Sequence, residues 1–245
     1  MTIEHLIYFC LLSLFAEILG TVGGFGSSIF FVPLAGLFLD FHSVLGITAL
    51  FHLSSNIAKI ALFKKGFDKK LILSIGIPAV IFTIIGGILS KYFDNGILEI
   101  SLAIFLIGIS LLFLIQQNFV LKPNLTNSIT GGALSGLAAG IVGTGGAIRG
   151  LTLSAFNLNV ETFIATSAII DLGIDLSRST VYFFNGYIHK DDLYLIAILF
   201  FVSFIGTYLG KKLLHSFSSA QFKKFVLALI LLVGITTLIS HLIKM

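Results

Sequence analysis

A glycine-broken apolar motif occurs twice in this chain. The first copy reads Val-Gly-Gly-Phe-Gly-Ser at residues 22–27, and the second reads Val-Gly-Thr-Gly-Gly-Ala at residues 142–147. Each copy interrupts one long apolar stretch and is followed by another. Apolar segments broken by glycine at corresponding places in two halves are typical of membrane transporters, whose broken helices build a binding site near the bilayer midplane. The duplication therefore predicts an all-α polytopic membrane protein made of two homologous repeats.

The composition agrees with a membrane protein. With 57% hydrophobic residues, 11% charged residues and a mean hydropathy of +1.08, the chain is not a soluble domain. Its length of 245 residues suits six to eight membrane segments. Most Lys and Arg residues lie in or beside short loops, where they orient a protein in the lipid bilayer, so the net charge of +4 does not indicate a nucleic-acid partner. The single Cys10 excludes a multi-cysteine metal site, and no metal or other cofactor is expected.

Eight apolar stretches follow one another, four in each half. They are expected at about residues 3–39, 43–63, 71–90, 96–115, 128–156, 160–184, 193–214 and 220–243. Breaks are expected at Gly20 to Gly26 in the first stretch and at Gly143 to Gly146 in the fifth. The first repeat then covers residues 1–117, a polar linker covers 118–127, and the second repeat covers 128–245. We expect the two repeats to form one integrated transmembrane domain.

The loop lysines favour one arrangement of these stretches. If all eight stretches simply cross, the lysines divide seven to five between the two sides, which decides nothing. If each broken stretch enters and returns on one side as a re-entrant helix pair, they divide nine to three, the bias that separates cytoplasmic from external loops. The nine are Lys64, Lys65, Lys69, Lys70, Lys122, Lys211, Lys212, Lys223 and Lys224. Each half then crosses three times, which inverts the repeats relative to each other and puts both termini outside. Eight plain crossings with parallel repeats are the alternative.

A polar stripe follows each break. In the first half the stripe is Thr48, His52, Asn56 and Lys59, and in the second half it is Ser167, Asp171, Asp175 and Arg178, each 119 positions later. An ionised side chain at the bilayer centre costs about 2.5–3.5 kcal/mol, so these groups should face an interior cavity or one another. Asp175 and Arg178 are spaced to pair within their own helix. Lys59 has no acid at that spacing. Its ammonium group could therefore pair with a ligand anion, pair with an acid from another helix, or extend to the membrane interface.

The residues beside the breaks suit an anion. A half-helix that starts after a glycine cluster directs free backbone N–H groups into the space between the halves. Arg149 follows the second break, and its planar guanidinium matches two oxygens of a sulfonate or carboxylate; a salt bridge to Asp171 or Glu17 is the alternative. The predicted substrate-binding residues are Arg149, Arg178, Lys59, Asn56, Thr48, Ser27, Ser167, Gly24, Gly26, Gly145 and Gly146.

Coupling of transport to protons would need a group that titrates near the substrate. The candidates are Asp171, His52, Glu17 and Asp175, because buried carboxylates and histidines gain and lose protons at moderate pH. A hydrogen-bonded core histidine is the alternative for His52. An intramembrane enzyme is a poorer reading, since the chain has no H-E-x-x-H motif, no G-x-S-x-G motif and no second cysteine. An anion channel would look much like a carrier in sequence.

The same segments resemble the TauE/SafE family of sulfite and organosulfonate exporters, also called the TSUP permeases. The resemblance covers nearly the whole chain and is most specific at residues 20–26, Gly-Thr-Val-Gly-Gly-Phe-Gly, and 140–146, Gly-Ile-Val-Gly-Thr-Gly-Gly. Pro33 fits the family pattern, whereas Leu153 at the corresponding place departs from it. The resemblance implies a secondary carrier of small, often sulfur-containing anions in the bacterial plasma (inner) membrane. It leaves open the anion, the direction of transport and a homodimer; Gly86, Gly87 and Gly206 also suit close helix packing within one chain.

Overall fold

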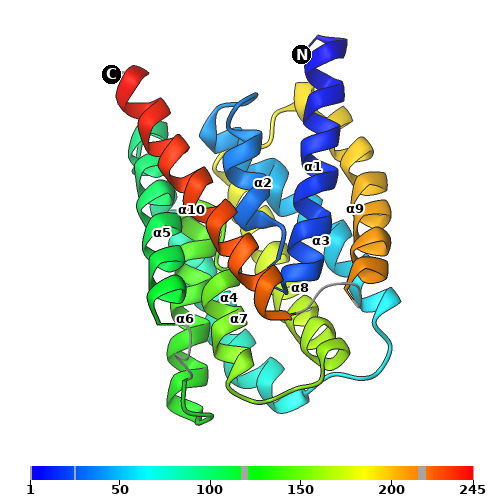
Figure 1. Cartoon of the computed structure of the whole chain (residues 1–245). Helices are drawn as coiled ribbons and strands as arrows, with labels where there is room; N and C mark the ends of the chain where they lie inside the picture. Colours follow the sequence, from blue (N-terminus) through cyan, green and yellow to red (C-terminus); the bar gives the residue numbers. More distant parts are fainter. Residues whose placement is uncertain (1, 25, 117–120, 215–218, 245) are drawn as a thin grey trace.

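The computed structural model of the chain is a bundle of helices (Figure 1). It describes residues 2–24, 26–116, 121–214 and 219–244, with side chains in the last range from 226 to 242. The helices are α1 (Ile3–Gly23), α2 (Ser28–Ala35), α3 (Phe41–Leu62), α4 (Lys69–Ser90), α5 (Asn95–Ile115), α6 (Leu125–Val142), α7 (Gly146–Ser154), α8 (Val160–Phe184), the short 3-10 helix η1 (Lys190–Asp192), α9 (Leu193–Leu213) and α10 (Ser219–Lys244). Phe25 of the first motif, residues 118–120 of the expected linker and the side chains of Lys223 and Lys224 lie outside the described residues.

Capping side chains fix where the helices start. Asp40 accepts a hydrogen bond from the Ser43 backbone N–H at 3.1 Å and begins α3. Asn159, 119 positions later, accepts one from the Thr162 N–H at 2.9 Å and begins α8. Such caps satisfy first-turn N–H groups that have no partner within the helix. Because the caps lie in the polar gaps between apolar stretches, the unbroken helices begin and end within two residues of the predicted bounds.

The two breaks end α1 and α6 at matching positions. Gly24 and Gly143, 119 residues apart, both cap their helices in the left-handed conformation, with φ of 70° and 80°. Glycine adopts this conformation at little cost. The expected extension of the first break back to Gly20 is wrong, because Gly20 lies within α1. A Cβ at Gly20 would overlap the backbone of Ser27, so this glycine lets the chain fold back against α1 after the break.

After each break the chain turns back toward the end of the bundle from which it came. In the first repeat, the Phe38 ring packs 5.6 Å from the Phe9 ring near the start of α1. In the second repeat, Thr152 of α7 packs so closely on Gly131 of α6 that a Cβ there would overlap it. Each broken segment is therefore a long helix followed by a short returning one, as Figure 1 shows for α1 and α2.

Two helix pairs run in the same direction and pack closely through glycine. The contacts are Gly206 with Glu17 and Gly210 with Thr21 between α9 and α1, and Gly132 with Ile75 and Gly136 with Ala79 between α6 and α4. Gly86 and Gly206 contact α6 and α1, and Gly87 contacts Val181 of α8. Gly86, Gly87 and Gly206 therefore allow helices of the same chain to pack closely against one another.

Two other helix pairs run in opposite directions. The contacts are Asn56 with Asp175 and Gly46 with the Tyr187 backbone for α3 and α8, and Gly96 with His241 and Gly234 with Leu106 for α5 and α10. Both termini lie at one end of the bundle (Figure 1). At the other end, Lys211 donates to the Leu62 carbonyl oxygen at 2.5 Å, which places the end of α9 beside the end of α3.

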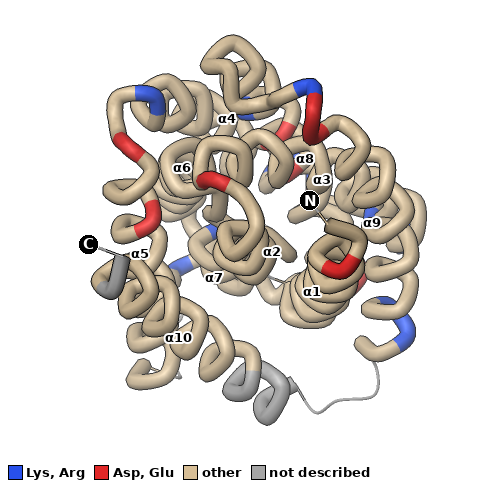
Figure 2. Tube along the Cα trace, turned by 90° about the horizontal axis from the view of Figure 1, so that it is seen from above, with Lys and Arg blue, Asp and Glu red and all other residues tan. Residues whose placement is uncertain are grey.

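Among the described residues, six helical segments are long and apolar enough to cross a membrane. They are α1, α3, α4, α5, α6 and the segment of η1 and α9 from Lys190 to Leu213. Helix α8 is 25 residues long but carries four charged residues, Glu161, Asp171, Asp175 and Arg178. Seen from above, acidic and basic positions are few and most lie at helix ends or in loops (Figure 2). The described part of the chain thus has the pattern of a multi-pass membrane protein.

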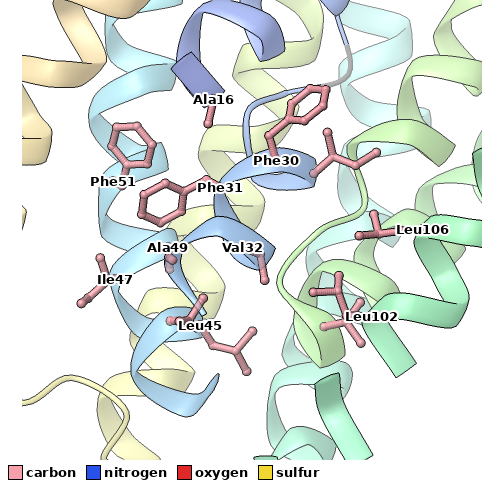
Figure 3. Packing of buried hydrophobic residues seen from close by; sticks show 14 of the residues in the cluster. Ala16, Phe30, Phe31, Val32, Leu45, Ile47, Ala49, Phe51, Leu102 and Leu106 are labelled. Atoms are coloured by element: carbon pink, nitrogen blue, oxygen red, sulfur yellow. The ribbon is translucent and has the colours of Figure 1, made fainter. Parts of the chain in front are cut away.

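An apolar core holds the short helix α2 in place. Phe30, Phe31 and Val32 are at most 2% exposed. They pack in one cluster with residues of α3 and α5, including Leu45, Phe51, Leu102 and Leu106 (Figure 3). Burying a phenylalanine or valine side chain contributes about 1.5–3 kcal/mol. This anchorage fixes the start of α2, where the polar residues of the first break lie.

Candidate functional site

The two breaks meet inside the bundle. Ser28 at the start of α2 and Thr144 in the second break are both buried, and their hydroxyl oxygens lie 3.1 Å apart. Helices α2 and α7 therefore begin near each other. The first N–H groups of a helix lack partners within it and carry a partial positive charge. Their junction consequently suits a negatively charged group.

The predicted glycines lie in two different surroundings. Gly24 and Gly26, both with positive φ, line a cavity beside the first break. A Cβ on Gly26 would stand 3.6 Å from the Nη2 atom of Arg149, so this glycine brings the backbone close to the guanidinium. Gly145 packs against the backbone of Ser135 on α6, and Gly146 is the first residue of α7. The first break therefore contributes cavity lining, and the second positions α7.

The two polar stripes meet at corresponding residues. The Asn56 side chain donates from Nδ2 to Asp175 Oδ2 at 2.6 Å, and both residues are at most 2% exposed. The two positions are 119 apart, which is also the offset between the stripes. Helices α3 and α8 thus contact each other at equivalent positions of the two repeats.

Arg178 is bound to the second break and to its own helix. Its Nε and Nη2 atoms each lie 2.7 Å from Asp175 Oδ1, and Nη1 donates to the Gly143 carbonyl oxygen at 2.7 Å. Gly143 is the residue that ends α6. The i,i+3 pairing that the sequence allowed is therefore present, and the guanidinium also holds the broken end of α6.

Arg149 links α7 to α8. It is 2% exposed, forms an ion pair with Asp171 through Nη1, and donates from Nε to the Ser167 hydroxyl at 2.9 Å. Of the two acids that the sequence offered as partners, Asp171 is the one in contact. Three predicted site residues thus come together on the second repeat.

Glu17 is the common hydrogen-bond and ion-pair partner of five polar side chains. Its carboxylate forms an ion pair with Lys59 at 3.0 Å. It also accepts hydrogen bonds from the hydroxyls of Thr21 at 3.3 Å, Ser55 at 2.6 Å, Thr207 at 2.9 Å and Ser27 at 2.5 Å. Lys59 is bonded in turn to Ser55 at 2.6 Å and is 6% exposed, so it does not reach the interface. One buried carboxylate therefore joins α1, the first break, α3 and α9.

Two residues of the first stripe behave differently from each other. His52 lies with its Nε2 atom 3.1 Å from the Ser27 hydroxyl, at the edge of the Glu17 group. Thr48 donates to the Val44 carbonyl oxygen of its own helix at 2.6 Å and is not joined to the other predicted residues by any bond of the described chain. Three partners of Glu17 were not predicted from the sequence: Thr21, Ser55 and Thr207. Ser55 had a signal, since it lies one turn before Lys59, whereas Thr207 is 190 residues from Glu17 and had none.

A small cavity lies between the two groups. It has a volume of about 10 Å³ and is lined by Gly20, Thr21, Gly24, Gly26, Lys59, Ile164, Ser167, Ala168 and Asp171. Such a volume holds about one water molecule. The cavity is thus narrow, with Lys59 and Asp171 both in its lining.

Comparison with protein families identifies a match over most of the chain. The family model described as "Sulfite exporter TauE/SafE" matches residues 9–237. This range includes both breaks, both stripes, most of α1 and the whole of the other five described segments that could cross a membrane. No curated protein matches the chain.

Proposed function

Because the chain belongs to the sulfite exporter TauE/SafE family and is a multi-pass membrane protein, we propose that it is a secondary transporter of a small anion. Sulfite, an organosulfonate or a similar sulfur-containing or carboxylate anion is the proposed substrate, and the bacterial plasma membrane is the proposed location. The observation that carries the proposal is the cavity beside the first break, whose lining includes Lys59 and also Asp171, the partner of Arg149.

The helix directions support inverted repeats and alternating access. Corresponding helices α3 and α8 run in opposite directions, as do α5 and α10. Each broken segment returns toward its starting end, so the first repeat begins and the second ends on the same side (Figure 1). In transporters built this way, the repeats rock around a central site and expose it to one side at a time.

The roles that we propose for the predicted residues follow their contacts. Arg149 and Lys59 hold the negative oxygens of the anion, since Lys59 lines the cavity and Arg149 lies beside Gly26, which also lines it. Ser27, Ser167 and the glycine-rich backbone donate neutral hydrogen bonds. Arg178, Asp175 and Asn56 hold α6, α8 and α3 together around the site, because their hydrogen bonds join these three helices.

Anion binding by the purified protein tests the function. We expect sulfite or a sulfonate to raise the melting temperature more than chloride or sulfate does at equal concentration, because a ligand stabilises the state that it binds. Protein in liposomes should then accumulate labelled sulfite against its gradient when unlabelled sulfite is loaded inside, a counterflow that a carrier supports and a channel does not. A melting temperature that responds to none of these anions would contradict the proposal.

Topology tests the inverted repeats. With Cys10 replaced, single cysteines in the loop of residues 64–70 and beside Lys211 should react only with a reagent that reaches the cytoplasm. A cysteine beside Lys91 should react from outside. We expect this result because nine lysines then lie on the cytoplasmic side. If the cysteines in residues 64–70 and beside Lys211 were labelled from opposite sides, the inverted arrangement would be wrong.

A further inference from the structure

The partners of Glu17 differ in kind from those of the other two buried acids of the site. Asp171 pairs with Arg149, and Asp175 pairs with Arg178 and Asn56. Glu17 has one cationic partner, Lys59, and four hydroxyl partners. A guanidinium only donates hydrogen bonds, so it cannot accept the O–H of a protonated acid beside it. A hydroxyl both donates and accepts, so the hydroxyls around Glu17 can receive the O–H of a neutral carboxyl.

The second repeat shows that packing does not require this acid. The position that corresponds to Glu17, 120 residues later, is Leu137. Gly86 of α4 lies against the backbone carbonyl oxygen of Leu137, and the corresponding Gly206 of α9 lies against the Glu17 side chain. The pair of α4 and α6 therefore has an apolar residue where the corresponding pair of α9 and α1 has an acid with polar partners. Replacing a buried ion pair with apolar residues is often neutral or stabilising, so the acid calls for a reason other than stability.

The charge balance of the site supplies that reason. Lys59, Arg149 and Arg178 are matched by Glu17, Asp171 and Asp175, so the described cluster is neutral when all six are ionised. An entering anion adds a negative charge that the buried surroundings compensate poorly. Neutralising one acid restores the balance.

We propose that Glu17 carries a proton together with the anion, an inference that rests on the transport function proposed above. Lys59 and Ser27 bind either the Glu17 carboxylate or the anion, but not both. As an anion enters, the Lys59–Glu17 ion pair opens and Glu17 takes up one proton from the same side, forming an O–H bond. When the anion leaves on the other side, Glu17 releases that proton there and the ion pair re-forms. One proton thus crosses with each anion.

The other ionisable groups near Glu17 are accounted for. Lys211 on α9 is held at the end of the bundle, where it donates to a backbone carbonyl oxygen. His52 is the remaining group that could take the proton, since it contacts Ser27. Replacing His52 separates its contribution from that of Glu17. The groups that surround Glu17 are Lys59 and His52 on α3, Asp171 on α8 and Lys211 on α9.

The pH dependence of sulfite binding tests this assignment. We compare the full-length protein with Glu17→Gln, which keeps the shape and hydrogen bonds of the side chain but cannot ionise. Between pH 6 and 8 the dissociation constant of the unaltered protein should rise by about tenfold per pH unit more than that of Glu17→Gln, because binding must take up one proton. At pH 8 the variant should bind sulfite more tightly than the unaltered protein, the opposite of losing a ligand contact. The titration of sulfite itself affects both proteins equally.

Matched variants make each outcome decisive. His52→Gln and Asp171→Asn should keep the pH slope of the unaltered protein, whatever their affinity. Glu17→Leu copies the second repeat and replaces Glu17→Gln if the latter does not fold. Equal slopes in the unaltered protein and the Glu17 variants would overturn the proton assignment alone, as would weaker binding by the variants at pH 8. Absence of sulfite binding in every protein would instead overturn the proposed function, and this inference with it.

Discussion

Replacing Arg178 with alanine should destabilise the protein by about 3–5 kcal/mol, because Asp175 is then left buried without its cation. Both side chains are 2% exposed, and the guanidinium also satisfies the carbonyl oxygen that ends α6. The change therefore removes the charge partner of α8 and the cap of the second break at once. We expect a melting temperature lower by roughly 6–20 °C in detergent, using the usual relation between stability and melting temperature for a chain of this size.

Two control variants separate the ion pair from general damage. Lys59→Ala removes the cation at the corresponding place of the first repeat, but Glu17 keeps four hydroxyl donors, so its loss of stability should be smaller. Arg178→Met combined with Asp175→Leu removes both charges and should recover part of the loss. A single Arg178→Ala variant that melts within 2 °C of the parent would show that the pair does not hold the second break.

The helices were predictable because their signals are local. Apolar runs of membrane length, ended by polar capping residues such as Asp40 and Asn159, determine where α3 and α8 begin. The break at Gly143 was also local, since only glycine adopts its positive φ at little cost. Gly20 looked the same in sequence, yet its purpose is the close approach of Ser27. A glycine that bends the chain and one that makes room for it cannot be told apart before the fold is known.

The site was predictable only where its partners share a helix. Arg178 and Asp175 are three residues apart, so their pairing follows from helical geometry. For Lys59 the sequence excluded a partner on its own helix but could not choose between a ligand, another helix and the interface. The partner is Glu17, brought together with Ser55 and Thr207 from separations of 38 and 190 residues. No spacing rule reaches across such distances, which is why the acid appeared as one titratable candidate among four rather than as the centre of the first repeat.

Arg149→Lys is the second change with a large expected effect, and it should act on binding rather than on folding. The guanidinium now divides its donors between Asp171 and the Ser167 hydroxyl. A lysine keeps the positive charge for Asp171, so the buried acid is not orphaned and the melting temperature should change little. The lysine lacks the planar guanidinium, which can donate hydrogen bonds to two oxygens of one anion at once. The loss of a hydrogen bond to a charged group is worth about 1.5–3 kcal/mol, so sulfite binding should weaken by roughly ten- to a hundredfold.

The Ser167→Ala variant provides the matched control, because it removes the bond to Arg149 Nε without altering the guanidinium. If Arg149 anchors the anion, Ser167→Ala should weaken sulfite binding far less than Arg149→Lys does. Both dissociation constants are measured at one pH, so that the proton taken up by Glu17 contributes equally. An Arg149→Lys protein that binds every tested anion as tightly as the parent would remove Arg149 from the site. The remaining cation that borders the cavity, Lys59, would then have to hold the anion alone, and it could do so only while Glu17 releases it.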